Sequence, residues 1–192
     1  MRPDAVTLRL AVLPRTGILV DVLLVVAGAA LVALAAQVRI PLDPVPITGQ
    51  TFAVLLVGAS LGAVRGLASL VVYTLAGIAG APVFQEQSHG WEYFAGATGG
   101  YIVGFVIAAG VTGWLAERRW DRRFSSAVAA MLTGNVLVYL FGLPWLAHVA
   151  NYDLLMTLQK GLAPFLPGDL VKLYLAAALL PGAWRLVERA KR

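Results

Sequence analysis

Apolar residues follow one another along this chain in stretches long enough to cross a bilayer. The first, Ile18–Ala36, is about 28 Å long as a helix and so spans the hydrocarbon core. Glycine and proline residues separate it from five later apolar stretches. The six predicted spans are Ile18–Ala36, Ile47–Leu61, Gly66–Ala81, Ala97–Leu115, Ser125–Leu146 and Gly168–Leu186. This pattern predicts an all-α integral membrane protein with six transmembrane helices in one bundle.

Two parts of this division have alternatives. The second and third spans are short, which leaves open whether one of them is tilted, broken or partly re-entrant. The first span follows Arg9 and Arg15, as in a secretory signal, but it is longer than the usual apolar region of about 7–15 residues. We therefore predict an uncleaved first span. No linker or internal repeat divides the chain, so residues 1–192 are predicted to form one domain that begins with a cytoplasmic segment, residues 1–17.

Composition supports a membrane protein. Hydrophobic residues make up 59% of the 192 positions and charged residues only 13%, about half the charged fraction of a typical soluble domain. Cysteine is absent, which excludes disulfides and thiolate chemistry. The formal net charge of +5 is typical of nucleic-acid binding or of membrane topology, and its distribution decides between the two.

The basic residues lie mostly on alternate connections between spans. In a topology with a cytoplasmic N-terminus, the outer connections hold only Arg39 and Lys160. Cytoplasmic connections are enriched in Lys and Arg, so both termini are predicted to be cytoplasmic in a multi-pass protein of the cell membrane. Topology accounts for these residues, and no nucleic-acid partner is expected. The predicted cytoplasmic set is Arg2, Arg9, Arg15, Arg65, Arg118, Arg119, Arg122, Arg123, Arg185, Arg189, Lys191 and Arg192.

Asp169 and Lys172 are the most unusual residues in the predicted spans. An ionised side chain at the bilayer centre costs about 2.5–3.5 kcal/mol, and a spacing of three puts both on one helix face. One alternative is structural: Asp169 follows Pro167 and Gly168 at a helix start, where the dipole favours an acid by about 0.3–1 kcal/mol. The other is that both groups face a cavity and bind a small polar ligand.

Further polar candidates open the second and fourth spans. Thr48, Gln50 and Thr51 begin the second span, and Thr98 and Tyr101 begin the fourth. Free backbone N–H groups at such helix starts bind carboxylates. Helix capping is the alternative at both places, and it is the preferred interpretation for Thr51.

Three other positions complete the set of candidates. Phe84 is suited to pack on the apolar part of a ligand, as is Tyr101, although a single aromatic residue is more often part of a core. Asn135 and Tyr139 share one face of the fifth span. There an interhelical hydrogen bond is the alternative to ligand binding.

Motifs for catalysis are absent from the sequence. His89 and His148 are isolated, with no metal-binding spacing, and Gly96–Tyr101 (GATGGY) lacks the Lys-Ser/Thr ending of a phosphate-binding loop. We therefore expect no enzyme activity, metal or cofactor in this chain. Ala29 and Ala33 form a small-residue pair on the first span, which serves either packing inside the monomer or docking to another membrane subunit.

Five strings, read together, resemble the BioY family, the biotin-specific S component of energy-coupling-factor vitamin transporters. They are PVPITGQTF (Pro44–Phe52), GIAGAPVF (Gly77–Phe84), ATGGYIVGF (Ala97–Phe105), GNVLVYLFGLPWL (Gly134–Leu146) and LPGDLVK (Leu166–Lys172). They cover the second to sixth spans in order. The chain departs from the family pattern at Ala81, at Ala97 and in the segment Gln85–Trp91.

The resemblance implies a six-helix fold with an outward-facing biotin pocket. It also implies an ATP-driven module of two ATPase subunits and a transmembrane coupling subunit, with Ala29 and Ala33 docking on the latter. ATP hydrolysis would then belong to the partners. The chain would be the substrate-binding subunit for biotin uptake. The alternative is a self-sufficient secondary transporter, against which the missing inverted repeat counts.

Biotin also fits the candidate side chains. The ureido ring has two N–H donors and one strong acceptor, so Asp169 is suited to the N–H groups. Lys172 meets either the ureido oxygen or the tail carboxylate, and the sequence does not decide which. The predicted site further includes Thr48, Gln50, Gln85, Thr98 and Asn135 as polar groups, with Phe84, Tyr101 and Tyr139 against the rings.

Overall fold

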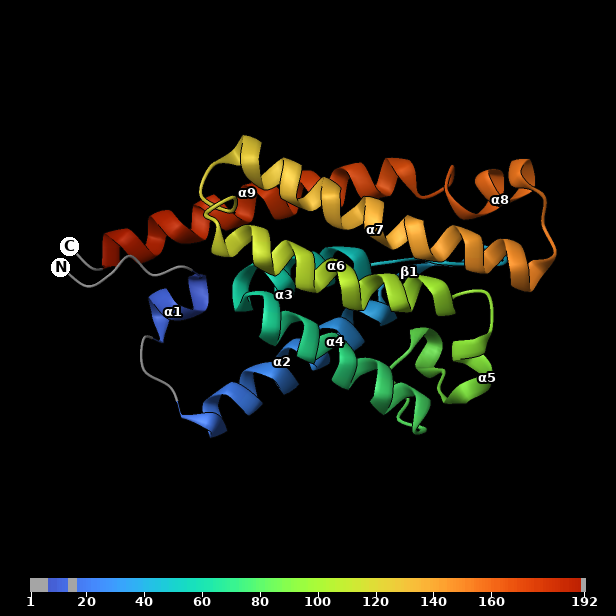
Figure 1. Cartoon of the computed structure of the whole chain (residues 1–192), viewed down its shortest axis with the longest axis horizontal. Coiled ribbons are helices and arrows are strands. Elements are labelled where there is room, and N and C mark those ends of the chain that lie inside the picture. Colours follow the sequence, from blue (N-terminus) through green and yellow to red (C-terminus); the bar gives the residue numbers. More distant parts are fainter. Residues whose placement is uncertain (1–6, 14–16, 191–192) are drawn as a thin grey trace.

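The computed structural model describes residues 7–13 and 17–190, which form helices and one short hairpin (Figure 1). The hairpin pairs strands β1 and β2 in antiparallel register, with Arg39 opposite Thr48 and Ile40 opposite Ile47. The elements are α1 (Leu8–Val12), α2 (Ile18–Gln37), β1 (Arg39–Ile40), β2 (Ile47–Thr48), α3 (Gln50–Leu61), α4 (Ala63–Ile78), the 3-10 helix η1 (Gln85–Gln87), α5 (Gly90–Ala95), α6 (Gly99–Glu117), α7 (Phe124–Ala150), α8 (Leu154–Gly161) and α9 (Leu166–Ala190).

Each of the six predicted spans overlaps one of these helices. Four of them, α2, α6, α7 and α9, are long and apolar enough to cross a membrane. The other two are shorter apolar helices: α3 has 12 residues and α4 has 16. At its length of about 18 Å, α3 is shorter than the hydrocarbon core, which is about 30 Å thick. The short second and third spans of the sequence are therefore short helices in the structure.

The start of the second span was predicted wrongly. Ile47 and Thr48 were assigned to a helix, but they form strand β2, and the helix begins at Gln50. The Gly49 amide donates a hydrogen bond to the Val38 carbonyl across the hairpin, 2.8 Å away. The predicted link Gly62–Arg65 is also shorter than expected, because Gly62, with φ +88°, makes the whole turn and α4 starts at Ala63.

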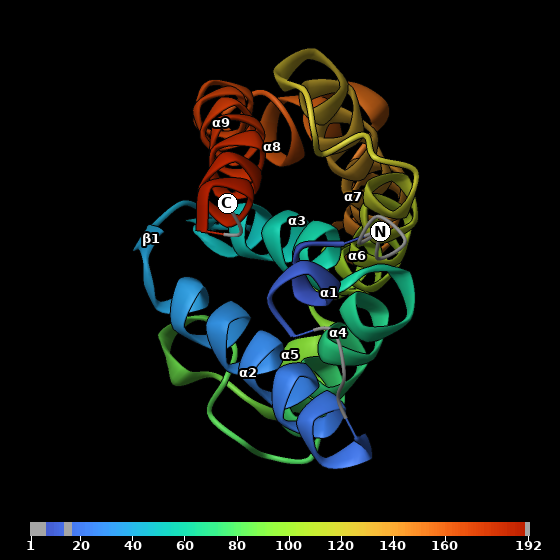
Figure 2. The same ribbon diagram turned by 90° about the vertical axis from the view of Figure 1, so that its left-hand side faces the viewer.

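Helix α6 is central to the packing and contacts α7, α3 and α4. Viewed from the end where the termini lie, α2 and α9 lie on opposite sides of α3 (Figure 2). Glycines permit the close approach of α6 to its neighbours. A Cβ on Gly104 would lie 2.8 Å from the Val138 Cα atom, and one on Gly58 would lie 2.4 Å from the Ala109 carbonyl oxygen. Small residues have this role in membrane helix bundles.

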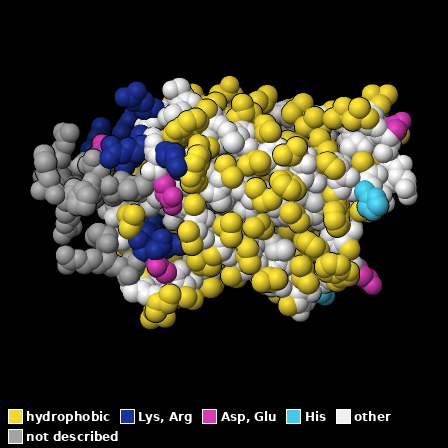
Figure 3. Space-filling model, in the orientation of Figure 1, with side chains coloured by type: hydrophobic (Ala, Val, Ile, Leu, Met, Phe, Trp, Pro, Cys, Tyr) yellow, Lys and Arg dark blue, Asp and Glu magenta, His cyan; other side chains and the backbone are white. Residues whose placement is uncertain are grey.

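The surface separates charge from apolar area. Hydrophobic side chains cover the middle of the face seen in Figure 3, and Lys and Arg gather at the end that holds the termini. Several helices carry exposed leucines and valines, for example Leu23 of α2, Val136 of α7 and Val171 of α9. Of the basic residues predicted to be cytoplasmic, Arg2, Arg15, Lys191 and Arg192 lie outside the described residues.

A carboxylate joins three helices at the end with the termini. Asp21 of α2 pairs with Arg9 of α1 at 2.6 Å and with Arg65 of α4 at 2.8 Å. Hydrogen bonding to Asp21 is the main cause that raises the pKa of Arg65. Helix α1, which lies in the predicted N-terminal segment, also contacts α3 and α9.

The small-residue face of α2 is turned inward. Ala29 is 7% exposed and belongs to the hydrophobic core, and Ala33 is partly buried against the same core. A Cβ on the neighbouring Gly28 would lie 2.5 Å from the Ser69 hydroxyl oxygen. Packing inside the monomer therefore accounts for the burial of Ala29, and the docking surface at Ala29 and Ala33 stays a prediction.

Candidate functional site

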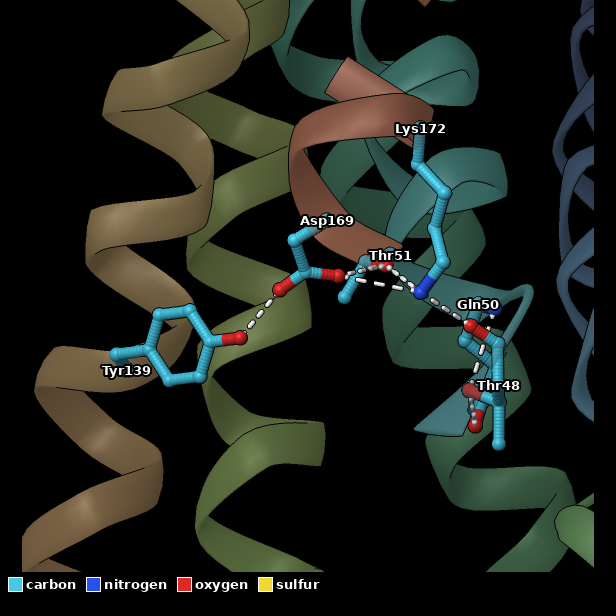
Figure 4. A network of polar contacts seen from close by, with 6 residues as sticks. All are labelled: Thr48, Gln50, Thr51, Tyr139, Asp169 and Lys172. Carbon is cyan, nitrogen blue, oxygen red and sulfur yellow. Dashed lines mark hydrogen bonds and ion pairs between the residues drawn. The ribbon is translucent and has the colours of Figure 1, made fainter. Parts of the chain in front are cut away.

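Asp169 lies in the first turn of α9 and is 4% exposed. Its Oδ2 accepts a short hydrogen bond from the Tyr139 hydroxyl of α7. Its Oδ1 accepts from the Thr51 hydroxyl at 3.3 Å and from the Lys172 ammonium at 3.1 Å (Figure 4). The helix dipole stabilises an acid at this position, as the structural alternative proposed. The side chain also accepts hydrogen bonds from donors on three helices, α3, α7 and α9.

Lys172 joins α9 to the start of α3. Its Nζ donates to the Thr48 carbonyl at 2.7 Å and to the Thr51 hydroxyl at 3.2 Å. The Thr48 carbonyl is available because the hairpin ends there, just before α3 begins. The opposite charge of Asp169 and the surrounding oxygen acceptors lower the free-energy cost of partly burying the Lys172 ammonium group.

The polar contacts continue to α4. The Thr48 hydroxyl donates to Gln50 Oε1 at 3.0 Å, and Gln50 Nε2 donates to the Tyr73 hydroxyl at 2.7 Å. These contacts form a continuous strip of donors and acceptors, which we call the polar strip. It consists of Tyr139, Asp169, Lys172, Thr51, Thr48, Gln50 and Tyr73.

The polar strip forms one wall of a partly open cavity, which encloses about 540 Å³ of space between atoms, solvent at its mouth included. The lining consists of Val45, Pro46, Thr48, Gln50, Thr51, Tyr73, Phe84, Gln85, Tyr93, Thr98, Tyr101, Ile102, Phe105, Val138, Tyr139, Phe165, Asp169 and Lys172.

Aromatic rings form the opposite walls. Phe84 packs edge-on against Tyr73, with ring centroids 5.5 Å apart, and stacks on Tyr93 at 5.1 Å. Tyr101 stacks on Phe165 at 6.4 Å. Burial raises the pKa of Tyr93, which lies in α5 outside the predicted spans. The cavity therefore offers one charged wall and several ring faces, a suitable combination for a flat apolar body with polar ends.

Nine of the ten residues predicted to bind substrate line this cavity. Asn135 does not: it is buried at 6% exposure on α7, one turn below Tyr139. The shared helix face was predicted correctly, but one turn displaces a side chain by about 5.4 Å along the axis. Asn135 therefore lies beyond the part of α7 that lines the cavity, at Val138 and Tyr139.

Two polar members of the strip were not predicted from the sequence. Thr51 was interpreted as a cap, yet its hydroxyl contacts both Asp169 and Lys172. Tyr73 is 1% exposed and carries a phenol hydroxyl in the middle of α4. That hydroxyl was a usable signal, because a buried phenol needs a hydrogen-bond partner. Tyr93 of α5 also lines the cavity, without having been predicted.

Metal binding has no support among the described residues. No group of three or more His, Asp or Glu side chains in residues 7–13 and 17–190 is placed to hold an ion. The chemistry available at the cavity is that of the strip itself. A carboxylate accepts N–H donors, and an ammonium group donates to an oxygen acceptor.

Known proteins are similar to this chain in sequence and in fold. Proteins named biotin transporter BioY are similar in sequence: the one from Rhizobium etli is 38% identical over 71% of this chain and 76% of its own length. The one from Thermotoga maritima is 35% identical over 78% and 87%. A crystal structure of the S-component for biotin from an ECF-type ABC transporter has the same fold, with a TM-score of 0.74 at 23% identity over 87% of this chain and 92% of that chain.

All five strings that resemble the BioY family contribute residues to the cavity: Thr48 and Gln50 from the first, Phe84 from the second, Thr98 and Tyr101 from the third, Tyr139 from the fourth, and Asp169 and Lys172 from the fifth. The family model matches residues 7–189. The resemblance seen in the sequence is thereby confirmed, and the chain belongs to the BioY family.

Proposed function

We propose that this chain is the substrate-binding membrane subunit of a biotin uptake transporter. The observation that carries the proposal is the position of Asp169 and Lys172 on one wall of a cavity in a BioY-family chain. The named relatives are transporters rather than enzymes. An acid and an amine that share a cavity of about 540 Å³ with aromatic rings suit a small ligand with a polar head and an apolar body.

In this proposal Asp169 accepts the ureido N–H groups of biotin. Tyr139 and Thr51 already orient the carboxylate by hydrogen bonds, so its geometry is fixed before the ligand arrives. Preorganised groups lose less conformational freedom on binding. The bicyclic body of biotin then packs between the rings of Phe84 and Tyr101, which lie on the cavity wall.

The test is binding of labelled biotin to the purified protein, with lipoate as the matched competitor. Lipoate has a similar acidic tail and a sulfur-containing ring but no ureido group. We expect roughly stoichiometric retention of biotin, displacement by unlabelled biotin, and little displacement by lipoate. Failure to retain biotin contradicts the proposed function. Equal competition by lipoate contradicts recognition through Asp169.

Biotin methyl ester is the probe for Lys172. If Lys172 meets the tail carboxylate, the ester binds much more weakly than biotin to the native protein but almost as well as biotin to Lys172→Met. If Lys172 meets the ureido oxygen, this substitution weakens both ligands alike. The comparison therefore assigns the ammonium group to one end of the ligand.

We further propose that both termini are cytoplasmic and that the cavity opens outward. Support comes from the Lys and Arg residues gathered at the end with the termini (Figure 3). Because the chain contains no cysteine, a single introduced thiol is a clean reporter. Glu92→Cys should react with an impermeant maleimide in intact cells, and Ser125→Cys should react only after lysis. The reverse pattern contradicts this orientation.

The proposed partners are a transmembrane coupling subunit and two ATPase subunits. The shared fold with an S-component of an ECF-type transporter supports them. Co-expression with such subunits should yield a complex whose biotin uptake into liposomes requires ATP. Uptake by this chain alone, driven by a proton gradient, would instead identify a self-sufficient secondary transporter.

A further inference from the structure

A second hollow, on the outer surface of the bundle, lies between α2 and α4. The two helices pack side by side, and both begin at the end that holds the termini (Figure 1). About 990 Å³ of space between atoms lies in this hollow, open solvent included. None of the residues that line it also lines the cavity at the polar strip. We call this separate feature the α2–α4 groove.

Most of the lining of the α2–α4 groove is valine, including Val22 and Val26 of α2 and Val64 and Val72 of α4. Val22 and Val26 are each 50% exposed, and Val64 is 77% exposed. Of the four helices that are long enough to cross a membrane, α2 has the smallest share buried inside the protein. Exposed apolar patches of this kind mark sites of membrane or protein interaction.

The α2–α4 groove has nearly the length of one membrane leaflet. Its lining extends from Ile18 to Val26 on α2 and from Val64 to Val72 on α4. Each stretch is about 12 Å long at the helical rise of 1.5 Å per residue. One leaflet contributes half of the hydrocarbon core, about 15 Å. An acyl chain that enters from the end with the termini therefore follows the groove toward the bilayer centre.

The end of the α2–α4 groove near the termini is charged, because Asp21 and Arg65 belong to its lining. Arg65 donates from Nε and Nη2 to the two oxygens of Asp21, at 2.9 and 2.8 Å. Arg65 Nη1 has no acceptor among residues 7–13 and 17–190, and the side chain is 30% exposed. Arginine N–H groups at headgroup depth are suited to a phosphate oxygen.

Two acids lie near these donors, and both have partners of their own. Asp21 accepts from Arg9 at 2.6 Å as well as from Arg65, so two guanidinium groups share one carboxylate. Glu117 accepts from the Ala63 N–H and does not line the α2–α4 groove. A phosphate at Arg65 Nη1 therefore meets a carboxylate whose charge is already compensated.

We propose that the α2–α4 groove binds one phospholipid of the leaflet next to the termini. The lipid phosphate accepts a hydrogen bond from Arg65 Nη1, and one acyl chain lies along the valines. A second copy of this chain or a helix of another subunit is the competing occupant. An apolar helix in the groove would bury the Arg65 donors without an acceptor, which destabilises such a contact. The site is independent of biotin, since it shares no residue with the cavity.

The first experiment is native mass spectrometry of the delipidated protein, titrated with palmitoyl-oleoyl phosphatidylglycerol. Palmitoyl-oleoyl glycerol keeps the chains without the phosphate, and dihexanoyl phosphatidylglycerol keeps the phosphate with short chains. We expect one firmly held molecule of the full lipid and at least about tenfold weaker binding of either comparison lipid, because a charged hydrogen bond and the buried CH₂ groups both contribute. Equal binding of palmitoyl-oleoyl glycerol contradicts the phosphate contact, and equal binding of the short-chain lipid contradicts the groove.

Ala68→Phe tests the groove itself, because Ala68 belongs to its lining and a ring there occupies the space of the acyl chain. We expect at least about tenfold weaker binding of palmitoyl-oleoyl phosphatidylglycerol, since the chain loses several buried CH₂ groups. The matched control is Ala178→Phe, which adds the same ring to the exposed face of α9 and should bind the lipid as the native protein does. Equal lipid binding by the two variants contradicts the site.

The charged end gives opposite expectations for two variants. Arg65→Gln removes the guanidinium donor and should weaken lipid binding by about tenfold. Asp21→Asn removes the carboxylate that competes with the phosphate, and should strengthen lipid binding by about two- to fivefold. A merely structural role of this ion pair would lower the unfolding temperature of both variants and weaken lipid binding in both. That second pattern contradicts the proposal.

The last experiment tests the competing occupants. The chain has no cysteine, so Val72→Cys carries a single thiol inside the α2–α4 groove. Oxidation in native membranes should give little disulfide-linked dimer, and a thiol-reactive photo-crosslinker at this position should label mainly lipid. Labelling mainly of a second copy or of another membrane subunit, without lipid, contradicts the proposal.

Discussion

Two buried carboxylates, one at each end of the molecule, differ in what surrounds them. Asp169, at the cavity, is 4% exposed and accepts hydrogen bonds from Tyr139, Thr51 and Lys172. Asp121, in the turn between α6 and α7, is 1% exposed. Its Oδ2 accepts from the Trp184 indole N–H at 2.5 Å. Both carboxylates thus combine burial, a basic neighbour and an aromatic donor.

The difference lies in access. Asp169 and Lys172 line the cavity, and both oxygens of Asp169 have donors. Asp121 is covered by Trp184, on whose ring the Arg122 guanidinium lies 3.4 Å from the centroid. Its Oδ1 accepts no hydrogen bond from the described residues, and burial raises the pKa of Asp121. Burial of a carboxylate therefore does not identify a binding site unless a cavity adjoins it.

The largest effect should follow from changing Asp169. Asp169→Asn keeps the shape of the side chain but replaces one acceptor by an N–H₂ group that opposes the ureido donors. The loss of a charged hydrogen bond costs about 1.5–3 kcal/mol, or about 10- to 100-fold in Kd. Titration with labelled biotin measures the change. A native Kd combined with a lower unfolding temperature would mean that Asp169 only stabilises the start of α9.

Gly77→Ala tests the aromatic wall without touching a polar group. A Cβ at Gly77 would lie 2.2 Å from the Phe84 ring, so the ring must move. Overpacking of this kind costs about 1–3 kcal/mol of folding stability. Part of this cost falls on the cavity wall, and we expect the Kd for biotin to rise by about 5- to 50-fold. Gly182→Ala in α9 is the matched control, since no atom lies within 4 Å of the added Cβ. Equal Kd values for the two variants would exclude Phe84 from the ligand contacts.

Tyr139→Phe should have a smaller effect. It removes the hydroxyl that orients Asp169 and leaves the ring on the cavity wall. A net hydrogen bond is worth about 0.5–1.5 kcal/mol, so the Kd for biotin should rise by about two- to tenfold. The same titration measures it. An effect as large as that of Asp169→Asn would show that Tyr139 contacts the ligand itself.

Asp121→Asn should leave binding unchanged, within about twofold in Kd, because distant sites act independently. Its effect is on stability. Since burial raises the pKa of Asp121 above its ordinary value of 3.8, the folded state disfavours the ionised form, and stability falls as the pH rises through the raised pKa. Thermal unfolding at neutral pH should therefore show a more stable variant. The gain should shrink as the pH approaches 4, and a destabilised variant at neutral pH contradicts this account.

Much of the fold was readable because bilayer-spanning helices carry a strong signal in apolar length. The ends of the elements were less readable. Ile47 and Thr48 have the composition of a span but pair with Arg39 and Ile40 in a hairpin. Pairing between two strands leaves no local pattern in the sequence. The inward orientation of Ala29 was equally hidden, because small residues serve close packing in either direction.

The candidate site was predicted from charge and hydrogen-bonding groups placed where lipid disfavours them. Asp169 and Lys172 followed from their cost in a bilayer. Asn135 did not line the cavity because depth along a helix is not fixed by helix face alone. Thr51 was missed because a threonine at a helix start has a local explanation. Arg39 and Glu86, which form an ion pair across 47 positions of the sequence, meet only through tertiary structure.

The turn at Gly62 fixes one end of α3. Glu117, the last residue of α6, accepts a hydrogen bond from the Ala63 N–H at 2.9 Å and so pins the turn to the central helix. Gln50 and Thr51 lie at the other end of α3, about 18 Å away, and Thr48 lies just before it. A tilt of α3 about this fixed turn would therefore move these three cavity-lining groups together.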